Sequence, residues 1–234
     1  MKFEEKYAPS KFEELVFGDI AARQLCERYA FGAPYKPLML WGPPGTAKTT
    51  TARVIVRERF RAADYDGDIE EFNGAEIVPD TLDTFNNIGS LMNFSMGDPL
   101  ILINEFDVME REMQVKFRAW MDRYKSINLL VTTNEQVNVE GVSQRLMPAL
   151  KSRFERLELP PLSVNDCLPR AQEILKQEGF DVSIANLKML LSGFTGDLRD
   201  MLPLLEAVVS KMQQGSAAQQ AKPTLQVVPP SQTP

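Results

Sequence analysis

The chain has 234 residues, and its 26 lysines and arginines are outnumbered by 32 aspartates and glutamates, so the formal net charge is −6. This charge argues against a protein that coats nucleic acid without specificity, although it leaves a local basic surface open. The complete lack of histidine excludes histidine general bases, serine–histidine triads and histidine-bound metals. Catalysis must therefore use carboxylates, lysine, arginine and hydroxyl groups.

Membrane insertion and a disulfide framework are both disfavoured. No apolar run approaches the roughly 20 residues needed to cross a bilayer, and the N-terminal stretch MKFEEKYAPSKF has no apolar signal core. Cys26 and Cys167 lie far apart and form no CxxC motif, which argues against a zinc ribbon. The sequence therefore predicts a cytoplasmic protein without membrane contact, in which both thiols lie in the core.

In chain order, short apolar runs alternate with amphipathic stretches. The runs predict strands at residues 37–41, 68–73, 100–104, 127–134 and 156–159. The stretches predict helices at residues 22–29, 49–61, 79–89, 110–124 and 142–151. Such alternation requires crossover connections, so it predicts an α/β fold with a five-stranded, mostly parallel sheet between helices.

The pattern changes after Pro160 and Pro161, where only helices are predicted, at residues 164–177, 184–192 and 199–213. From residue 214 the sequence QGSAAQQAKPTLQVVPPSQTP has few large apolar residues, so it cannot bury enough surface to offset its ordering entropy. We therefore expect an α/β domain at residues 1–160, a small all-helical lid domain at 161–213 and a disordered tail at 214–234.

The stretch WGPPGTAKTT follows a predicted strand and opens a predicted helix, which is the context of a phosphate-binding loop. Its spacing fits GxxxxGK[ST], except that Ala47 replaces the second glycine. Glycines allow the tight turn, helix-start amides point at phosphate, and the lysine and threonine supply a cation and a magnesium ligand. The predicted nucleotide contacts are Gly42, Pro43, Pro44, Gly45, Thr46, Ala47, Lys48, Thr49 and Thr50. The alternative is a Gly–Pro turn before a helix with an incidental lysine.

A second motif, LILIN followed by Glu105, lies about 55 residues downstream, a usual separation in phosphate-loop enzymes. There the last strand residue binds Mg²⁺ through water, and the following glutamate orients and deprotonates the attacking water. Glu105 is therefore the candidate general base, and Asn104 joins Thr49 as a candidate metal ligand. Because an amide carries no charge, Asn104 predicts weaker Mg²⁺ affinity and slower turnover rather than inactivity. The alternative is a solvated strand end.

Together with EEKYAPSKFEELVFGD near the N-terminus, these motifs resemble the AAA+ ATPases, and within them the clamp-loader ATPase subunits of cells and phages. The resemblance covers roughly residues 4–210. It implies a P-loop AAA+ fold that binds ATP and Mg²⁺ and hydrolyses ATP to ADP and phosphate. EKYAP resembles the family's EKYRP near the adenine, and the stretch VFG resembles its VGQ turn. These two matches imply contacts of Tyr7, Val16 and Phe17 with the base.

Four further stretches match the family in order. EFNGAE resembles ELNASD, which implies that Asn73 restrains Glu105 until partners assemble. TTNE resembles the sensor 1 strand, which places Asn134 between the base and the γ-phosphate. PALKSRF is similar to EPIQSRC, so Arg153 is the implied arginine finger, acting on the ATP of a neighbouring subunit. GDLRDM resembles the sensor 2 motif GDMR, so Arg199 is expected to reach the nucleotide from the lid.

The resemblance is weaker for assembly and DNA contact. Clamp-loader subunits carry a C-terminal helical collar, and this chain stops where the collar would begin, which favours a homo-oligomeric ring or spiral held by the ATPase interfaces. The helix predicted at residues 79–89 is poor in cations and carries Asp80 and Asp83, which argues against a family-like grip on DNA. Lys116 and Arg118 leave DNA contact open.

The leading hypothesis is an oligomeric, magnesium-dependent AAA+ ATPase of clamp-loader type, which remodels or loads a partner on DNA. That partner would be a sliding clamp or another DNA-bound protein, in replication or in the DNA metabolism of a mobile element. One alternative is an AAA+ remodeller of a protein partner without DNA contact. The other is a nucleotide-dependent assembly module with slow hydrolysis.

Overall fold

The computed structural model describes residues 2–32, 36–96, 100–134 and 145–220. Its centre is a five-stranded sheet with the order β2–β3–β4–β1–β5. Each pair of neighbouring strands is parallel. The strands are β1 (Leu38–Trp41), β2 (Glu71–Asn73), β3 (Leu100–Asn104), β4 (Asn128–Thr133) and β5 (Glu155–Glu158). The predicted α/β fold with a parallel sheet is confirmed, and each predicted strand overlaps an observed one.

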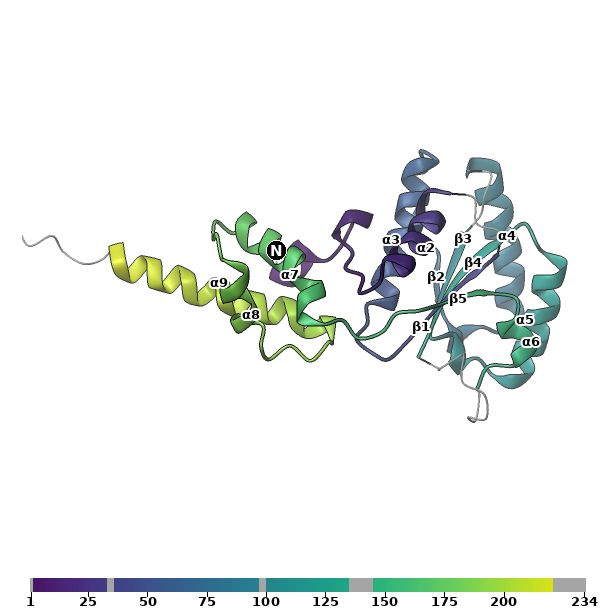
Figure 1. The fold of residues 1–234 in the computed structure, drawn as a ribbon. Coiled ribbons are helices and arrows are strands. Elements are labelled where there is room, and N and C mark those ends of the chain that lie inside the picture. Colours follow the sequence, from purple (N-terminus) through teal and green to yellow (C-terminus); the bar gives the residue numbers. More distant parts are fainter. Residues whose placement is uncertain (1, 33–35, 97–99, 135–144, 221–234) are drawn as a thin grey trace, which may run out of the picture.

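Helices cover both faces of this sheet (Figure 1). On one face lie α2 (Ile20–Phe31) and α3 (Lys48–Ala62); on the other lie α4 (Pro79–Met96), α5 (Arg111–Arg123) and α6 (Pro148–Lys151). In β1, Leu38 and Leu40 pack with α2 and α3, whereas Met39 and Trp41 belong to the opposite cluster. Alternate side chains of a strand point to opposite faces, so a strand buried on both faces has an unbroken apolar sequence.

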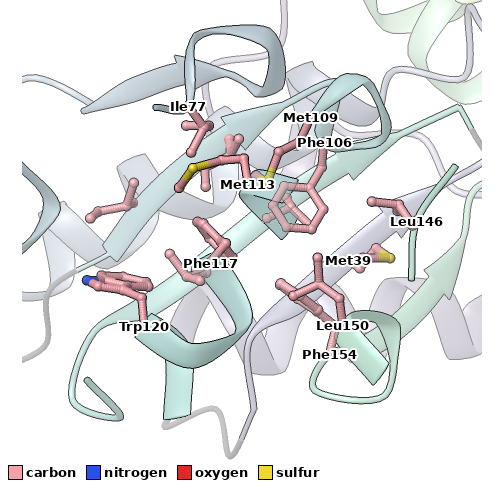
Figure 2. Close-up of a cluster of buried hydrophobic side chains, with 14 of the residues drawn as sticks. Met39, Ile77, Phe106, Met109, Met113, Phe117, Trp120, Leu146, Leu150 and Phe154 are labelled. Atoms are coloured by element: carbon pink, nitrogen blue, oxygen red, sulfur yellow. The ribbon is translucent and has the colours of Figure 1, made fainter. Parts of the chain in front are cut away.

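The core beneath α5 and α6 is rich in aromatic rings (Figure 2). The ring centroid of Phe106 lies 5.3 Å from that of Phe117 and 5.5 Å from that of Phe154. All three residues are buried, and such ring pairs add about 0.5–1.5 kcal/mol beyond the burial of their area. Phe106 directly follows Glu105 and Phe154 directly follows Arg153. One packed core therefore fixes the backbone beside two predicted functional residues.

Three helices form the lid, which lies to one side of the sheet (Figure 1). They are α7 (Val164–Gln177), α8 (Ile184–Leu190) and α9 (Leu198–Gln220), and they enclose a core of their own. Helix α7 begins where predicted because Ser163 caps it: the backbone N–H of Ser163 donates to the Asp166 carboxylate at 2.8 Å, and the Ser163 hydroxyl accepts from the Asp166 N–H.

The N-terminal residues connect the lid to the sheet domain. Helix α1 (Phe3–Tyr7) places Tyr7 in the lid core, whereas the short 3-10 helix η1 (Phe12–Glu14) and Leu15 pack into the core beside α2 and α3. We call residues 3–16 the N-terminal strap. Although the sequence assigned residues 1–160 to the α/β domain, the start of the strap packs with the lid.

The lengths of several helices differ from the prediction. The helix predicted at residues 142–151 is reduced to α6, because Met147 precedes Pro148 and takes an extended conformation, with residues 142–144 outside the described part. Helix α4 extends beyond Gly89 to Met96. Helix α9 continues to Gln220, into the predicted tail, where glutamine and alanine favour helix. Residues 221–234 of that tail lie outside the described residues. No helix in the described part combines the length and apolar character that a bilayer crossing needs.

Candidate nucleotide site

A cavity of about 420 Å³ lies where the phosphate loop, the ends of β3 and β4, the N-terminal strap and the lid meet. This volume is in the range of small-molecule sites, about 300–1,000 Å³. The cavity brings together most of the predicted site residues, which come from segments far apart in the sequence. Those lining it are Tyr7, Val16, Gly45, Thr46, Ala47, Lys48, Thr49, Thr50, Glu105, Asn134 and Arg199.

The phosphate loop between β1 and α3 has the backbone that its glycines allow. Gly42 and Gly45 have φ of 151° and 84°, in the region that residues with a side chain rarely adopt. Ala47 also lies in the left-handed region, with φ 57° and ψ 23°, immediately before α3 begins at Lys48. For an alanine this conformation costs roughly 1–2 kcal/mol. The departure from the motif at position 47 is therefore a point of backbone strain.

Lys48 is folded against the loop that it follows. Its Nζ donates to the carbonyl oxygen of Gly42 at 2.9 Å and to that of Pro43 at 2.7 Å. The pKa of Lys48 is lowered to about 8, chiefly by burial and then by the positive charge of Arg199, against the opposing effect of Asp107. An anion between the two cations would reverse this shift, so the site favours a phosphate there.

The lid closes directly on the phosphate loop. The backbone N–H of Leu198 donates to the carbonyl oxygen of Gly45 at 2.9 Å, at the start of α9. The Asp197 carboxylate lies against Gly45, where an added Cβ would stand 2.2 Å from it, and accepts from the Arg199 N–H at 2.9 Å. Gly45 therefore serves the contact with the lid as well as the turn, and α9 begins beside the predicted phosphates.

Glu105 directly follows β3 and has a left-handed conformation, with φ 50° and ψ 45°. Its Oε2 accepts from Asn73 Nδ2 at 3.1 Å, across the adjacent strand β2. Gly74, which opens the 3-10 helix η2 (Gly74–Glu76), allows this approach, because a Cβ there would stand 2.3 Å from the Glu105 carbonyl oxygen. The arrangement joins the candidate base to the residue expected to restrain it.

Asn104 does not line the cavity, and its amide is committed elsewhere. Its Oδ1 accepts from Thr132 Oγ1 at 3.0 Å, and its Nδ2 donates to the Glu71 carboxylate. The Glu71 carboxylate in turn accepts hydrogen bonds from Nε and Nη2 of Arg53, at 2.8 and 2.7 Å. The side chain of Asn104 thus joins β2, β3 and β4 by hydrogen bonds, and its expected role toward a metal-bound water stays a prediction.

The fit of the site to Mg²⁺ follows from the donors that remain. Thr49 lines the cavity, and the described residues contain no cluster of three or more acidic or cysteine side chains that could hold a metal ion. In phosphate-loop sites Mg²⁺ takes most of its ligands from water and substrate phosphates. The residues present therefore fit a metal held by the nucleotide and Thr49, and do not fit one bound to protein alone.

Asp107 is a positioning residue that the sequence did not single out. It lies in the 3-10 helix η3 (Phe106–Val108), is 6% exposed, and its Oδ1 accepts from Thr133 Oγ1 at 2.8 Å and from the Asn134 N–H at 3.3 Å. It thereby fixes the end of β4, where Asn134 enters the cavity. Only its position two residues after Glu105 could have indicated this role.

The strap forms the other end of the cavity. Tyr7 and Val16 line it, whereas Phe17 lines a separate small recess and packs on Phe12, with ring centroids 5.8 Å apart. The predicted contact of Phe17 with the base is therefore not part of this arrangement. Arg170 of α7 does line the cavity, and no motif indicated it.

Arg170 ties the strap to the lid. It is 8% exposed; its Nη2 donates to the Tyr7 carbonyl oxygen at 3.4 Å and lies 3.7 Å from Glu14 Oε1. Its Nη1 donates to Glu173 at 2.8 Å, and its buried Nε has no hydrogen-bond partner in the part of the chain described. The cation is thus held at the junction of two segments that are distant in the sequence.

Residues 38–162 match the family model of the ATPases associated with various cellular activities, AAA, which spans more than half of the chain. The chain belongs to the AAA family. The match begins at β1 and includes the phosphate loop, the ends of β3 and β4, and Arg153. The AAA fold expected from the motifs is therefore confirmed.

Curated relatives of this AAA chain include replication factor C subunits. Subunit 3 of Blastobotrys adeninivorans is 28% identical over 216 residues, which are 90% of this chain and 61% of the relative. Subunit 5 of Homo sapiens is 25% identical over 210 residues, 87% of this chain and 58% of the relative. The chain thus spans about three fifths of the length of these relatives.

Solved structures show the same fold at lower identity. The Thermotoga maritima RuvB Holliday junction branch migration motor has a TM-score of 0.65 at 16% identity, covering 92% of this chain and 68% of that one. The replication initiator DnaA bound to AMPPCP and single-stranded DNA has a TM-score of 0.64 at 16% identity, covering 90% of this chain and 68% of that one. The phosphate loop and the lid therefore sit in an AAA framework.

Arg153 is another predicted site residue that does not line the cavity. It follows α6, and its guanidinium bonds Asp122 of α5 at the surface of the sheet domain. An arginine that does not line the cavity of its own chain cannot contact a nucleotide there. Its implied role requires a second copy.

Proposed function

We propose that this AAA chain is an oligomeric, magnesium-dependent ATPase of clamp-loader type, which uses ATP binding and hydrolysis to remodel or load a partner on DNA. One observation carries the proposal. Lys48 of the phosphate loop, Glu105 at the end of β3 and Arg199 of the lid line one cavity, although they are separated widely in the sequence. Phosphate recognition, a candidate base and a lid cation thus meet at one place.

ATP fits the two ends of the cavity. The triphosphate would lie against the loop amides, Lys48 and Arg199, because these supply the positive charge, and the base would lie toward Tyr7 and Val16. Thr49 would hold Mg²⁺ together with the phosphates, and the bound metal would neutralise part of their charge. Arg199 belongs to the lid and Lys48 to the sheet domain, so bound phosphates would favour closure of the lid.

Hydrolysis would use Glu105 as the base. Its carboxylate accepts a proton from a water molecule while the water oxygen bonds to the γ-phosphorus and the bond from that phosphorus to the β,γ-bridging oxygen breaks. Lys48, Arg199 and the Arg153 of a neighbouring copy balance the charge that spreads over the phosphate oxygens. In the present arrangement one oxygen of Glu105 is bonded to Asn73, so full activity requires that bond to be released.

The output would be a change in the relation between lid and sheet domain. Residues that touch the nucleotide come from both, and the N-terminal strap packs into both. In a homo-oligomeric ring or spiral, hydrolysis at one interface would change the angle between the lid and the sheet domain of that copy. The change would shift the neighbouring copies and the surface that the ring offers to a partner. A sliding clamp or another DNA-bound protein suits such a motion, and the similarity to replication factor C subunits supports this class of partner.

A second function, a nucleotide-dependent assembly module with slow hydrolysis, is favoured by one observation. Asn104 is neutral and bonded to Thr132 and Glu71, so no carboxylate follows the apolar run of β3 at that position. Such a module would bind ATP to hold copies together and release them slowly. It differs from the leading proposal in turnover and not in binding.

The experiment is a steady-state ATPase assay over a range of protein concentrations, with and without primed DNA, alongside direct ATP-binding measurements. We expect turnover per copy to rise with protein concentration and with DNA, and the DNA effect to disappear at raised salt. Arg153→Ala should abolish the concentration-dependent turnover, a loss of about 10³-fold or more, while ATP binding persists. Lys48→Ala should lose binding, and Lys188→Ala, at an exposed site in α8, should change neither.

The outcomes separate the functions. Turnover that ignores DNA but responds to a co-purified protein would favour a remodeller without DNA contact. Tight binding with negligible turnover at every concentration would favour the assembly module. Loss of ATP binding in Arg153→Ala would show that the finger assignment is wrong.

A further inference from the structure

The Arg153 side chain is held by more hydrogen bonds than a solvent-exposed arginine usually makes. Its Nε donates to Asp122 Oδ1 at 2.8 Å and its Nη2 to Asp122 Oδ2 at 2.7 Å, while its Nη1 donates to the Ala149 carbonyl oxygen. All three guanidinium nitrogens are therefore engaged, although the Arg153 and Asp122 side chains are 28% and 55% exposed. An arrangement of this kind sets both the position and the plane of the group.

Both partners stand on fixed supports. The Arg153 N–H donates to the Leu150 carbonyl oxygen at 3.1 Å, and the next residue, Phe154, is buried in the aromatic core. Asp122 lies on α5, which the buried rings of Phe117 and Trp120 anchor in the same core (Figure 2). The ion pair therefore joins two rigid elements and leaves little freedom to the guanidinium.

The geometry of the ion pair leaves an N–H at the tip of the guanidinium available to a phosphate oxygen. Asp122 occupies the edge formed by Nε and Nη2, so the second N–H of Nη2 and one N–H of Nη1 remain without a bond from these partners. The remaining N–H of Nη2 points away from the Nε edge, toward the tip of the side chain, because the guanidinium is planar. A side-on carboxylate can thus hold an arginine while the tip still receives phosphate oxygens.

Stability alone does not account for the pair. Exposed ion pairs contribute about 0–1 kcal/mol and hold two long side chains at an entropic cost. Arg28 and Glu155 form another exposed ion pair, with a shortest N–O distance of 2.6 Å. Glu155 lies two residues after Arg153 in the sequence. That pair provides a comparison, because no site residue takes part in it.

We infer that Asp122 is a positioning residue of the ATPase reaction: it orients Arg153 so that the tip of the guanidinium meets the terminal phosphate of ATP bound to an adjoining copy. This inference rests on the proposed function. A cation delivered in trans helps only if it arrives in the geometry of the transition state, and a misplacement of 1 Å can cost about a hundredfold in rate.

The test measures turnover per copy at saturating protein and ATP, together with the dissociation constant of ATP. Asp122→Ala should lower turnover about ten- to a hundredfold and leave the ATP dissociation constant unchanged. Asp122→Glu should recover part of the rate, because it keeps the carboxylate. Arg28→Ala breaks the comparison pair and should leave turnover at the wild-type value.

The double variant Asp122→Ala/Arg153→Ala decides whether the two residues act as a unit. We expect it to match Arg153→Ala alone, since Asp122 acts only through the arginine. A further loss in the double variant, or a rate increase in Asp122→Ala, would overturn the inference; the increase would mean that Asp122 withholds the finger. If Arg153→Ala loses turnover while Asp122→Ala keeps it, this inference alone fails. If the wild type never hydrolyses ATP, the proposed function fails with it.

Discussion

The two ends of the nucleotide cavity are built in different ways. The proposed phosphate end is mostly local: one loop and the first turn of α3 supply Gly45, Lys48 and Thr49, and the lid adds Arg199. The base end is assembled from the N-terminal strap and helix α7 of the lid, which Arg170 joins through the Tyr7 carbonyl oxygen and Glu14. A local site keeps its geometry whenever its loop folds, whereas an assembled site depends on how the lid and the sheet domain are placed.

This difference suggests that the base end transmits the state of the site. Disturbing the loop should alter how tightly phosphate binds. Disturbing the strap should alter how firmly the lid is attached and, through it, the response to nucleotide. Three substitutions and one pH dependence, each with a control variant, probe the two ends and the strand between them.

The largest effect is expected at Arg170. Arg170→Ala should lower the free energy of unfolding by about 2 kcal/mol, because it removes charge-assisted hydrogen bonds to the strap and lid from a buried position. Thermal unfolding with and without ATP measures it. The stabilisation by ATP should also shrink, since the base end loses a wall.

Glu173 provides the control for that substitution. It is the exposed partner of Arg170, with its side chain 53% exposed, so Glu173→Gln should change stability by less than about 1 kcal/mol and leave ATP binding intact. Equal effects of the two variants would mean that the contacts of Arg170 with the strap add nothing, and the distinction between the two ends would not hold.

At the phosphate end the expected effect is a pH dependence of ATP binding. The pKa of Lys48 is lowered to about 8 in the free protein, and phosphates would raise it, so binding above pH 8 requires uptake of a proton. Affinity for ATP should fall by up to about tenfold per pH unit above that value. Isothermal titration in buffers of different ionisation enthalpy would detect the proton.

The effect of pH on folding stability has the opposite sign to its effect on ATP affinity. A lysine whose pKa is lowered on folding binds more protons in the unfolded chain, so its contribution to the free energy of unfolding rises between pH 8 and its ordinary value of 10.5. Lys48→Arg is the control, because a guanidinium stays charged throughout this range. If the variant and the wild type show the same pH slope of binding, Lys48 does not titrate in this window.

The sequence predicted the locally built parts of the site better than the parts that are assembled from distant segments. The phosphate loop, the strand before Glu105 and the lid helix bearing Arg199 were predicted, because spacing and apolar pattern determine them locally. Arg170 and Asp107 were missed, since a lone arginine in a helix and an aspartate after a strand have no pattern of their own. The side-chain bonds of Asn104 and the packing of Phe17 depend on neighbours that only the folded chain brings close.

Asn104→Asp tests the strand between the two ends. The introduced carboxylate would face Glu71, which now accepts from the Asn104 amide, so we expect a loss of about 1 kcal/mol in the free energy of unfolding at pH 7. The pKa of the new acid would be raised on folding; the loss is therefore complete above that pKa and disappears below about pH 4.

Metal should relieve the same repulsion. If the new charge reaches the metal site, Mg²⁺ with ATP should stabilise Asn104→Asp more than the wild type, and turnover should rise or need less Mg²⁺. Asn104→Ala, which removes the amide without adding charge, is the comparison. Identical responses of all three proteins to Mg²⁺ would place position 104 outside the metal's reach.

The smallest effect is expected at Ala47, where the phosphate end carries its strain. Ala47→Gly should raise the free energy of unfolding by about 0.5–1 kcal/mol, because relief of the left-handed alanine outweighs the greater freedom of glycine in the unfolded chain. Ala119→Gly, at an exposed position inside α5, should instead lower it by about 1 kcal/mol. Chemical denaturation measures both free energies of unfolding. If the same Ala→Gly change stabilises the protein at position 47 and destabilises it at position 119, the left-handed backbone of the loop accounts for the difference. A loss of stability at both positions would mean that Ala47 is not strained.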